Sequence, residues 1–262
     1  MSLQLIFGMS MSNLRMYLKF GQKIIVQILK HDPAAKIQLP TPEEVSEFTA
    51  AVHSKHPALT NVWATMDGVK LLLQQSGNDL IQNQFYNGWT HDHYVSNVFC
   101  FAPDGTVRIA FFNVPGCVHD SQIADWGNMF EVTGARCTVD SAFCTSGGNG
   151  RFLLKPSQDD TVSHRTNRSE QCDEIAVLRA ATSMRQASEW GMRAFQSSFP
   201  RLKDRFVYEE RGDRRRVIKM CVLLLNFRAN KVGINQIRNY YMPHLNQDAN
   251  VFMHQQYDNN HV

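Results

Sequence analysis

Acidic residues that follow short apolar runs have the clearest chemical potential in this sequence. Asp67 follows the run VWATM at residues 62–66, Asp120 ends the segment PGCVHD, and Asp140 follows CTV at residues 137–139. Carboxylates gathered at strand ends repel one another unless a divalent cation neutralises them. The pattern therefore predicts metal-assisted phosphoryl chemistry as the first hypothesis.

Each of these acids also has a simpler structural interpretation. Asp67 precedes Gly68 and could begin a turn, and Asp120 precedes SQI and could cap a helix. Taken one at a time, the simpler roles are the commoner ones. Only their occurrence together favours a metal site.

Composition sets broad limits on the class of protein. The chain has 262 residues, of which 43% are hydrophobic, so it can bury a full core. Lys and Arg number 27 against 24 Asp and Glu. This mild basic excess permits contact with a polyanion without requiring it.

The cysteines argue against a zinc or disulfide framework. All six are far apart in the sequence and none forms a C-x-x-C pair. No stretch of eighteen apolar residues and no secretory leader is present in the sequence, so we expect an intracellular, soluble, reduced protein.

The first sixty residues have helical spacing. Residues 11–31 mix apolar and basic side chains with a predicted break at Gly21, and Thr41-Pro42-Glu43-Glu44 is typical of a helix start. Two or three helices are expected here, in a stretch too short to form a well-cored domain of its own.

A strand-rich pattern begins at Asn61. It predicts strands at residues 62–66, 93–102, 107–114, 137–139 and 151–155, with a hairpin turn at residues 103–106. Helices are predicted at residues 121–130, 171–199 and 214–230. This order of elements is that of a ribonuclease H-like domain, which is an α/β fold with a mixed sheet flanked by helices.

Four ordered motifs carry a resemblance to a known family. They are QNQFYNGWTH at residues 82–91, NVPGCVHDS at 113–121, VDSAF at 139–143 and EWGMRAFQSSFPRLK at 189–203. Together they resemble the PIF/Harbinger-type DDE transposases, also described as DDE superfamily endonucleases. The resemblance runs from about residue 61 to residue 235.

This resemblance implies an enzyme of the nucleus that cuts and joins DNA strands with Mg²⁺ or Mn²⁺. Asp67, Asp120, Asp140 and Glu189 match the family's acids and would be both catalytic residues and metal ligands. Asp120 and Asp140 compete for the role of principal second acid. From the residues alone, a surface ion-pair ladder with Arg185 and Arg193 is the natural interpretation of Glu189, and only the resemblance makes it a ligand.

Basic residues after the long helix are candidates for contact with the DNA backbone. They are Arg201, Lys203, Arg214, Arg215 and Arg216. A solvated helix end explains the three consecutive arginines equally well. Trp89 and Tyr86 could contact an unstacked base, although loop aromatics are more often buried.

The expected organisation is a helical segment at residues 1–60, a nuclease domain at 61–236 and a tail at 237–262. The family commonly carries a helix-turn-helix segment before the nuclease domain, and the turn signals of residues 1–60 are poor. A Myb-like DNA-binding partner, which the resemblance implies, could supply that recognition. Two alternatives remain: a catalytically inactive module that binds DNA or protein, and a related nuclease that acts on RNA.

Overall fold

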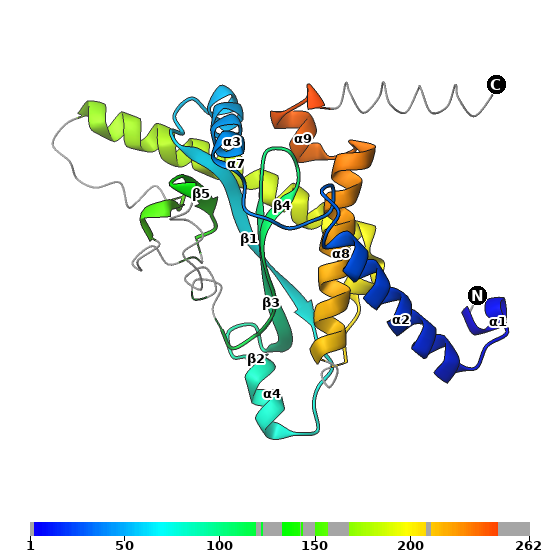
Figure 1. The fold of residues 1–262 in the computed structure, drawn as a ribbon. Coiled ribbons are helices and arrows are strands. Elements are labelled where there is room, and N and C mark those ends of the chain that lie inside the picture. Colours follow the sequence, from blue (N-terminus) through cyan, green and yellow to red (C-terminus); the bar gives the residue numbers. More distant parts are fainter. Residues whose placement is uncertain are drawn as a thin grey trace, which may run out of the picture.

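The computed structural model describes residues 3–118, 122, 133–141, 143, 150–156, 168–207 and 211–245. Figure 1 shows the arrangement of these segments. The helices are α1 (Leu3–Phe7), α2 (Met11–Leu29), α3 (Pro42–Lys55), α4 (Asp79–Phe85), η1 (Gly150–Phe152), α7 (Arg168–Ser198), η3 (Pro200–Lys203), α8 (Arg211–Val232) and α9 (Gln236–Tyr241). The strands are β1 (Val62–Leu72), β2 (Tyr86–Asn87), β3 (Asp92–Phe101), β4 (Val107–Pro115), β5 (Arg136–Val139) and β6 (Leu153–Leu154). The predicted helix at 121–130 lies outside the described residues.

The described strands form one mixed sheet of six, flanked by helices (Figure 1). β3 pairs antiparallel with β1 on one side and with β4 and the short β2 on the other. β5 pairs parallel with β1, and β6 parallel with β5. β3 is buried along nearly its whole length, as expected of a strand covered on both faces. The predicted mixed α/β class is confirmed.

β1 is longer than the sequence predicted. We expected the strand to end at residue 66, and this expectation is wrong, as is the alternative that Asp67 and Gly68 begin a turn. Asp67 pairs with Phe99 and Gly68 with Val98, and the ladder continues to Leu72. The strand continues because β3 offers ladder partners along that whole length, which outweighs the local turn preference of Asp-Gly. Asp67 therefore lies inside the sheet.

Helix α7 packs closely against this sheet. The ring of Phe195 meets that of Phe99 edge-on, with centroids 5.1 Å apart. A Cβ placed on Gly191 would lie 2.5 Å from Cε1 of Phe101, so the helix backbone and the strand approach more closely than any other residue allows. Phe99 and Phe101 have the same parity on β3, so α7 covers the face to which they point.

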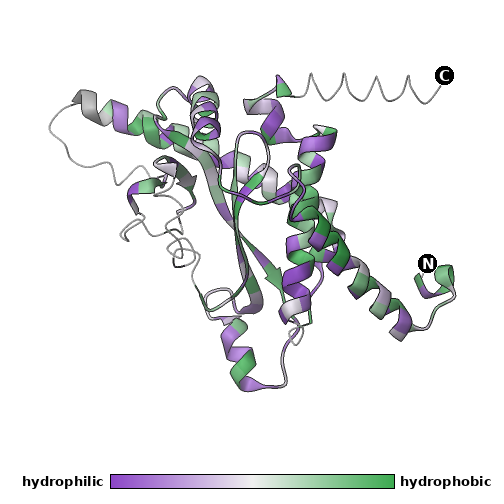
Figure 2. Ribbon diagram, in the orientation of Figure 1, coloured by the Kyte–Doolittle hydropathy of each residue, from purple (hydrophilic) through white to green (hydrophobic). Residues whose placement is uncertain are grey.

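The N-terminal helices are joined to the rest of the fold. α2 runs without interruption through Gly21, so the predicted break there is wrong, and it packs against α8. α3 starts where a helix start was predicted, with Pro42 at the first turn, and Thr41 and Glu44 form a reciprocal capping box there. Phe48 of α3 stacks on Trp63 of β1. Much of α2 remains apolar and exposed, as the green ribbon in Figure 2 shows.

The C-terminal helices attach to the β3–β4 hairpin. Buried Asn226 of α8 accepts a hydrogen bond from the N–H of Val107 and donates one to its carbonyl, at 2.8 and 3.0 Å. Asn235, the N-cap of α9, donates to the carbonyl of Gly105 at the hairpin turn. α9 extends across the boundary predicted at residue 236. The turn end of the hairpin is thus held by two side-chain amides.

No helix in the described segments combines the length and the apolar character needed to cross a membrane. Of the cysteines described, Cys100, Cys137 and Cys221 are buried thiols, while Cys117 and Cys172 are exposed.

Candidate active site

Strand register places the backbone of Asp140 next to that of Asp67. Met66 of β1 is paired with Val139 of β5 in a parallel ladder; Asp67 is the next residue of β1, and Asp140 directly follows the last residue of β5. Neighbouring strands lie about 4.8 Å apart, so the two backbones are adjacent at this point. The two positions are 73 residues apart in the sequence, and the sheet alone brings them together.

The register also fixes the face to which Asp67 points. Residues directly opposite in an antiparallel pair project to the same side of a sheet, and Asp67 is opposite Phe99. Phe99 packs against Phe195 of α7. Asp67 therefore projects toward the side that α7 covers, where it is half-buried and its Oδ1 accepts the N–H of Gly68 at 2.7 Å.

Arg185 connects the strand-end acid to the helix acid. Its Nη1 donates to Oδ1 of Asp140 at 2.7 Å, and its Nη2 donates to Oε1 of Glu189 at 2.9 Å. One guanidinium thus bridges β5 and α7 and brings the two carboxylates within one side chain of each other. The sequence suggested the pair of Arg185 and Glu189, but it gave no sign that Asp140 is the second partner.

All donors at this site are carboxylate oxygens, the ligand type that suits Mg²⁺ and Mn²⁺. Asp67, Asp140 and Glu189 therefore fit such an ion in chemistry, and a cationic guanidinium already lies between two of them. Within the described part of the chain, no three His, Cys, Asp or Glu side chains are grouped closely enough to hold a metal. Asp120, the fourth predicted ligand, lies outside the described residues, as does its neighbour His119.

The predicted phosphate-binding residues have different surroundings. Arg201 and Lys203 are exposed on η3, and Arg215 and Arg216 lie in the first turns of α8. Arg214 is 3% exposed: its Nε donates to Oδ1 of Asn113 and its Nη1 to the carbonyl of Val207 at 2.9 Å. Burial, with a smaller effect of Arg211, lowers the pKa of Arg214 to about 10. Arg214 therefore stays charged at neutral pH and holds α8 against β4.

The loop before β3 presents an exposed aromatic residue. Trp89 is 91% exposed, so it is not buried as most loop aromatic residues are. Asn87 shapes the loop by accepting hydrogen bonds from the N–H groups of Trp89 and Thr90. Tyr86 is partly exposed and bonds to His91.

Comparison with known protein families shows the family of the chain. The family model described as DDE superfamily endonuclease matches residues 66–226, which is more than half of the chain. The chain therefore belongs to the DDE superfamily endonucleases. Searches of curated proteins and of solved structures gave no match. The matched region contains every residue predicted to be a metal ligand.

Proposed function

We propose that this protein is a metal-dependent DNA endonuclease and transposase of the PIF/Harbinger type, with a ribonuclease H-like catalytic domain. The observation that carries the proposal is the in-register pair of Asp67 and Asp140, joined to Glu189 through Arg185. Family membership makes DNA cleavage the natural chemistry for carboxylates that the strand register and Arg185 bring to this part of the sheet.

The order of strands supports the ribonuclease H-like assignment. In spatial order the sheet reads β4-β3-β1-β5-β6, with β3 antiparallel and β5 and β6 parallel to β1. That is an antiparallel meander of three strands extended on one side by two parallel strands. In this arrangement, acids at neighbouring positions of the central strand and its parallel neighbour would lie under a helix, and Asp67 and Asp140 are the candidates for these positions.

The site would work by holding charge at fixed positions. Two divalent ions, when bound, would activate a water or a 3′-hydroxyl and stabilise the leaving oxygen of an in-line displacement. Asp67 and Asp140 would supply oxygen ligands from the rigid sheet, Glu189 one from α7, and Asp120 a fourth. Arg185 would release one or both of its carboxylates as those oxygens turn to the ions. No covalent nucleophile from the protein is needed.

The alternative from another class is an inactive module that binds DNA or protein, and the ion pairs of Arg185 are the observation that favours it. These ion pairs neutralise the charges of Asp140 and Glu189 without a metal, as a surface ion-pair network would. We further propose DNA rather than RNA as substrate, the nucleus as location, and a Myb-like partner for end recognition. These three rest on the family resemblance of the motifs.

A nicking assay on supercoiled plasmid with Mn²⁺ or Mg²⁺ tests the proposal. Asp67→Asn should lower the cutting rate by roughly a thousandfold, since losing a metal ligand removes several kcal/mol of transition-state stabilisation. Asp173→Asn, a change at an exposed carboxylate of α7, should leave the rate unaltered. Cutting that persists in Asp67→Asn, or that needs no divalent ion, would favour the inactive module and a contaminating nuclease.

A further inference from the structure

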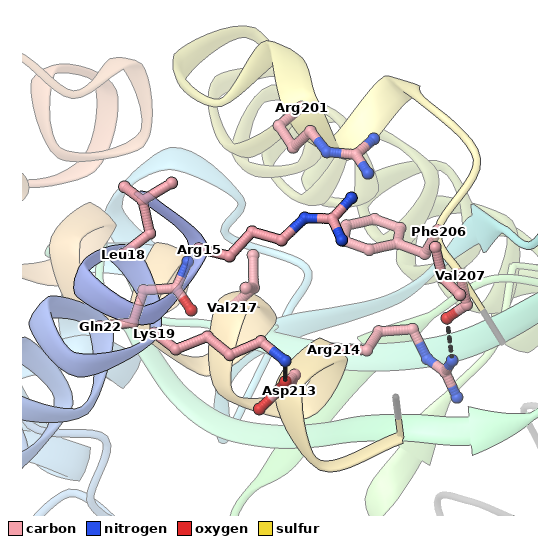
Figure 3. A pocket seen from close by; sticks show the side chains of 10 residues that line it. All are labelled: Arg15, Leu18, Lys19, Gln22, Arg201, Phe206, Val207, Asp213, Arg214 and Val217. Carbon is pink, nitrogen blue, oxygen red and sulfur yellow. Dashed lines mark hydrogen bonds and ion pairs between the residues drawn. The ribbon is translucent and has the colours of Figure 1, made fainter. Parts of the chain in front are cut away.

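The seam between α2 and α8 contains a basic pocket whose described lining residues include none of the proposed metal ligands. Figure 3 shows its lining, and its volume is about 250 Å³. Four cationic side chains line it, two from α2 and one each from η3 and α8. They are Arg15, Lys19, Arg201 and Arg214. The sequence pattern of residues 11–31 did not predict that α2 lines a basic pocket.

A second pocket continues the seam toward the C-terminal end of α2. It has a volume of about 510 Å³ and lies between the same two helices and β4. Its cationic side chains are Lys30, Arg215, Arg216 and Lys219. Arg215 and Arg216, which were predicted to bind DNA, therefore belong to a larger surface that α2 completes.

Negative charge along this seam is scarce. Among the described residues that line the two pockets, Asp213 is the one acid, and both Lys19 and Arg216 contact it at 2.7 Å. The hydrogen bond from Lys19 and, more weakly, that from Arg216 lower the pKa of Asp213, so it remains ionised and occupied. Across the residues that the structure describes, the two pockets together are lined by eight cationic side chains, one of them the buried Arg214, and by a single carboxylate.

Two arginines from distant parts of the chain converge at the mouth of the first pocket. The guanidinium groups of Arg15 and Arg201 point into the same space beside the ring of Phe206 (Figure 3). Arg201 lies over that ring at 5.1 Å and pairs with Asp204 only at the exposed surface, at 3.2 Å. Arg15 has no ion pair within the described segments. Like charges brought together in this way favour an anion between them.

We propose that the α2–α8 seam binds consecutive phosphates of a nucleic-acid backbone, with Arg15 and Arg201 clamping one phosphate. This inference rests on the proposed function and names where that site's substrate is held. From Arg15 to Lys30 the helix rises roughly 22 Å, enough to follow about six base pairs of duplex. A row of cationic pockets suits a regular polyanion better than a single small anion, because each pocket can take one phosphate.

Binding of a fluorescein-labelled DNA duplex of arbitrary sequence, followed by anisotropy in EDTA, tests this inference. The double variant R15Q/R201Q loses the single phosphate that both side chains clamp, so it should bind roughly eightfold more weakly at 0.1 M salt, since each lost phosphate contact removes about 0.9 from the salt slope. The salt slope itself should fall by about one. Both side chains are exposed, so the thermal melt should match that of the wild type.

The matched control is K23Q/R179Q, which removes two exposed cations that line neither pocket. Its affinity should stay within about twofold of the wild type, because no phosphate contact is lost. If both double variants lose the same affinity for DNA, the seam is not the binding site, and the protein attracts DNA diffusely through its net charge. Because EDTA prevents metal-dependent cutting, the result is independent of the nicking assay. If the wild type binds DNA through the seam but does not cut it, only the proposed nuclease activity is refuted. If the wild type cuts DNA and R15Q/R201Q binds DNA as tightly as the wild type, only the proposed role of the seam is refuted.

Discussion

At the scale of single residues, Arg185 determines the state of the site. Its guanidinium supplies the positive charge that Asp140 and Glu189 need in the absence of a metal, through contacts at 2.7 and 2.9 Å. A divalent ion that binds these oxygens competes with it. Because all three side chains are partly solvent-exposed, the competition involves a modest free energy.

Arg185→Gln should therefore tighten the uptake of Mn²⁺, measured by isothermal titration calorimetry. We expect up to roughly fivefold, corresponding to the ~1 kcal/mol of a partly exposed ion pair. Arg185→Lys keeps the positive charge and should resemble the wild type. Weaker uptake in Arg185→Gln would mean instead that Arg185 orients the carboxylates for the ion.

At the scale of elements, the approach of α7 to the sheet sets the position of Glu189 and Arg185. Gly191 lies two residues beyond Glu189 and lets the helix backbone contact Phe101, which is 1% exposed. A larger residue would displace the helix that carries two members of the site. The same feature therefore serves packing and the geometry of the acids.

Gly191→Ala should lower the free energy of unfolding by about 1–2 kcal/mol, measured by urea denaturation. Overpacking a tight core costs about 1–3 kcal/mol, which the better helix propensity of alanine offsets in part. Gly21→Ala is the matched control: it also replaces a glycine inside a helix, and its Cβ meets nothing within 4 Å. That variant should gain about 0.5–1 kcal/mol. The same sign for both changes would disprove the role of the close contact.

At the scale of the whole molecule, helices from distant parts of the chain meet through a buried histidine. Nε2 of His56, the C-cap of α3, lies 3.0 Å from the hydroxyl of Tyr241 at the end of α9. Burial lowers the pKa of His56 and raises that of Tyr241. His56 is therefore held neutral in the folded protein, with the aromatic rings of Tyr240 and Tyr241 beside it.

This burial predicts a pH-dependent stability. A histidine whose folded pKa is below its unfolded value of about 6.5 takes up a proton on unfolding. Its contribution is therefore complete above about pH 6.5 and is lost as the pH falls toward the folded pKa. Urea denaturation from pH 7.5 to 5 should show this loss in the wild type, and His56→Gln should flatten it. His31→Gln, at an exposed histidine, should keep the wild-type dependence of the unfolding free energy on pH. If His56→Gln also keeps that dependence, another group than His56 causes it.

Sequence patterns succeeded where local signals and tertiary structure agree. The helix start at Thr41, the hairpin around Gly105 and the long helix ending near residue 198 were each predicted from local residues and are present. Local signals failed at Gly21 and at Asp67-Gly68, since packing against α8 and pairing with β3 supply free energy that the local sequence does not reveal. The short helix α4 was not predicted at all.

The sequence by itself determined the class of this protein, because ordered motifs and the types of their acids can be recognised without coordinates. It also supplied Asp67, Asp140 and Glu189 as candidates, although not their partners. Only the tertiary structure decided that β1 and β5 align two of these acids, that Arg185 joins the third, and that α2 and α8 share a basic seam. Strand register and helix packing depend on contacts between distant residues, and no local pattern encodes them.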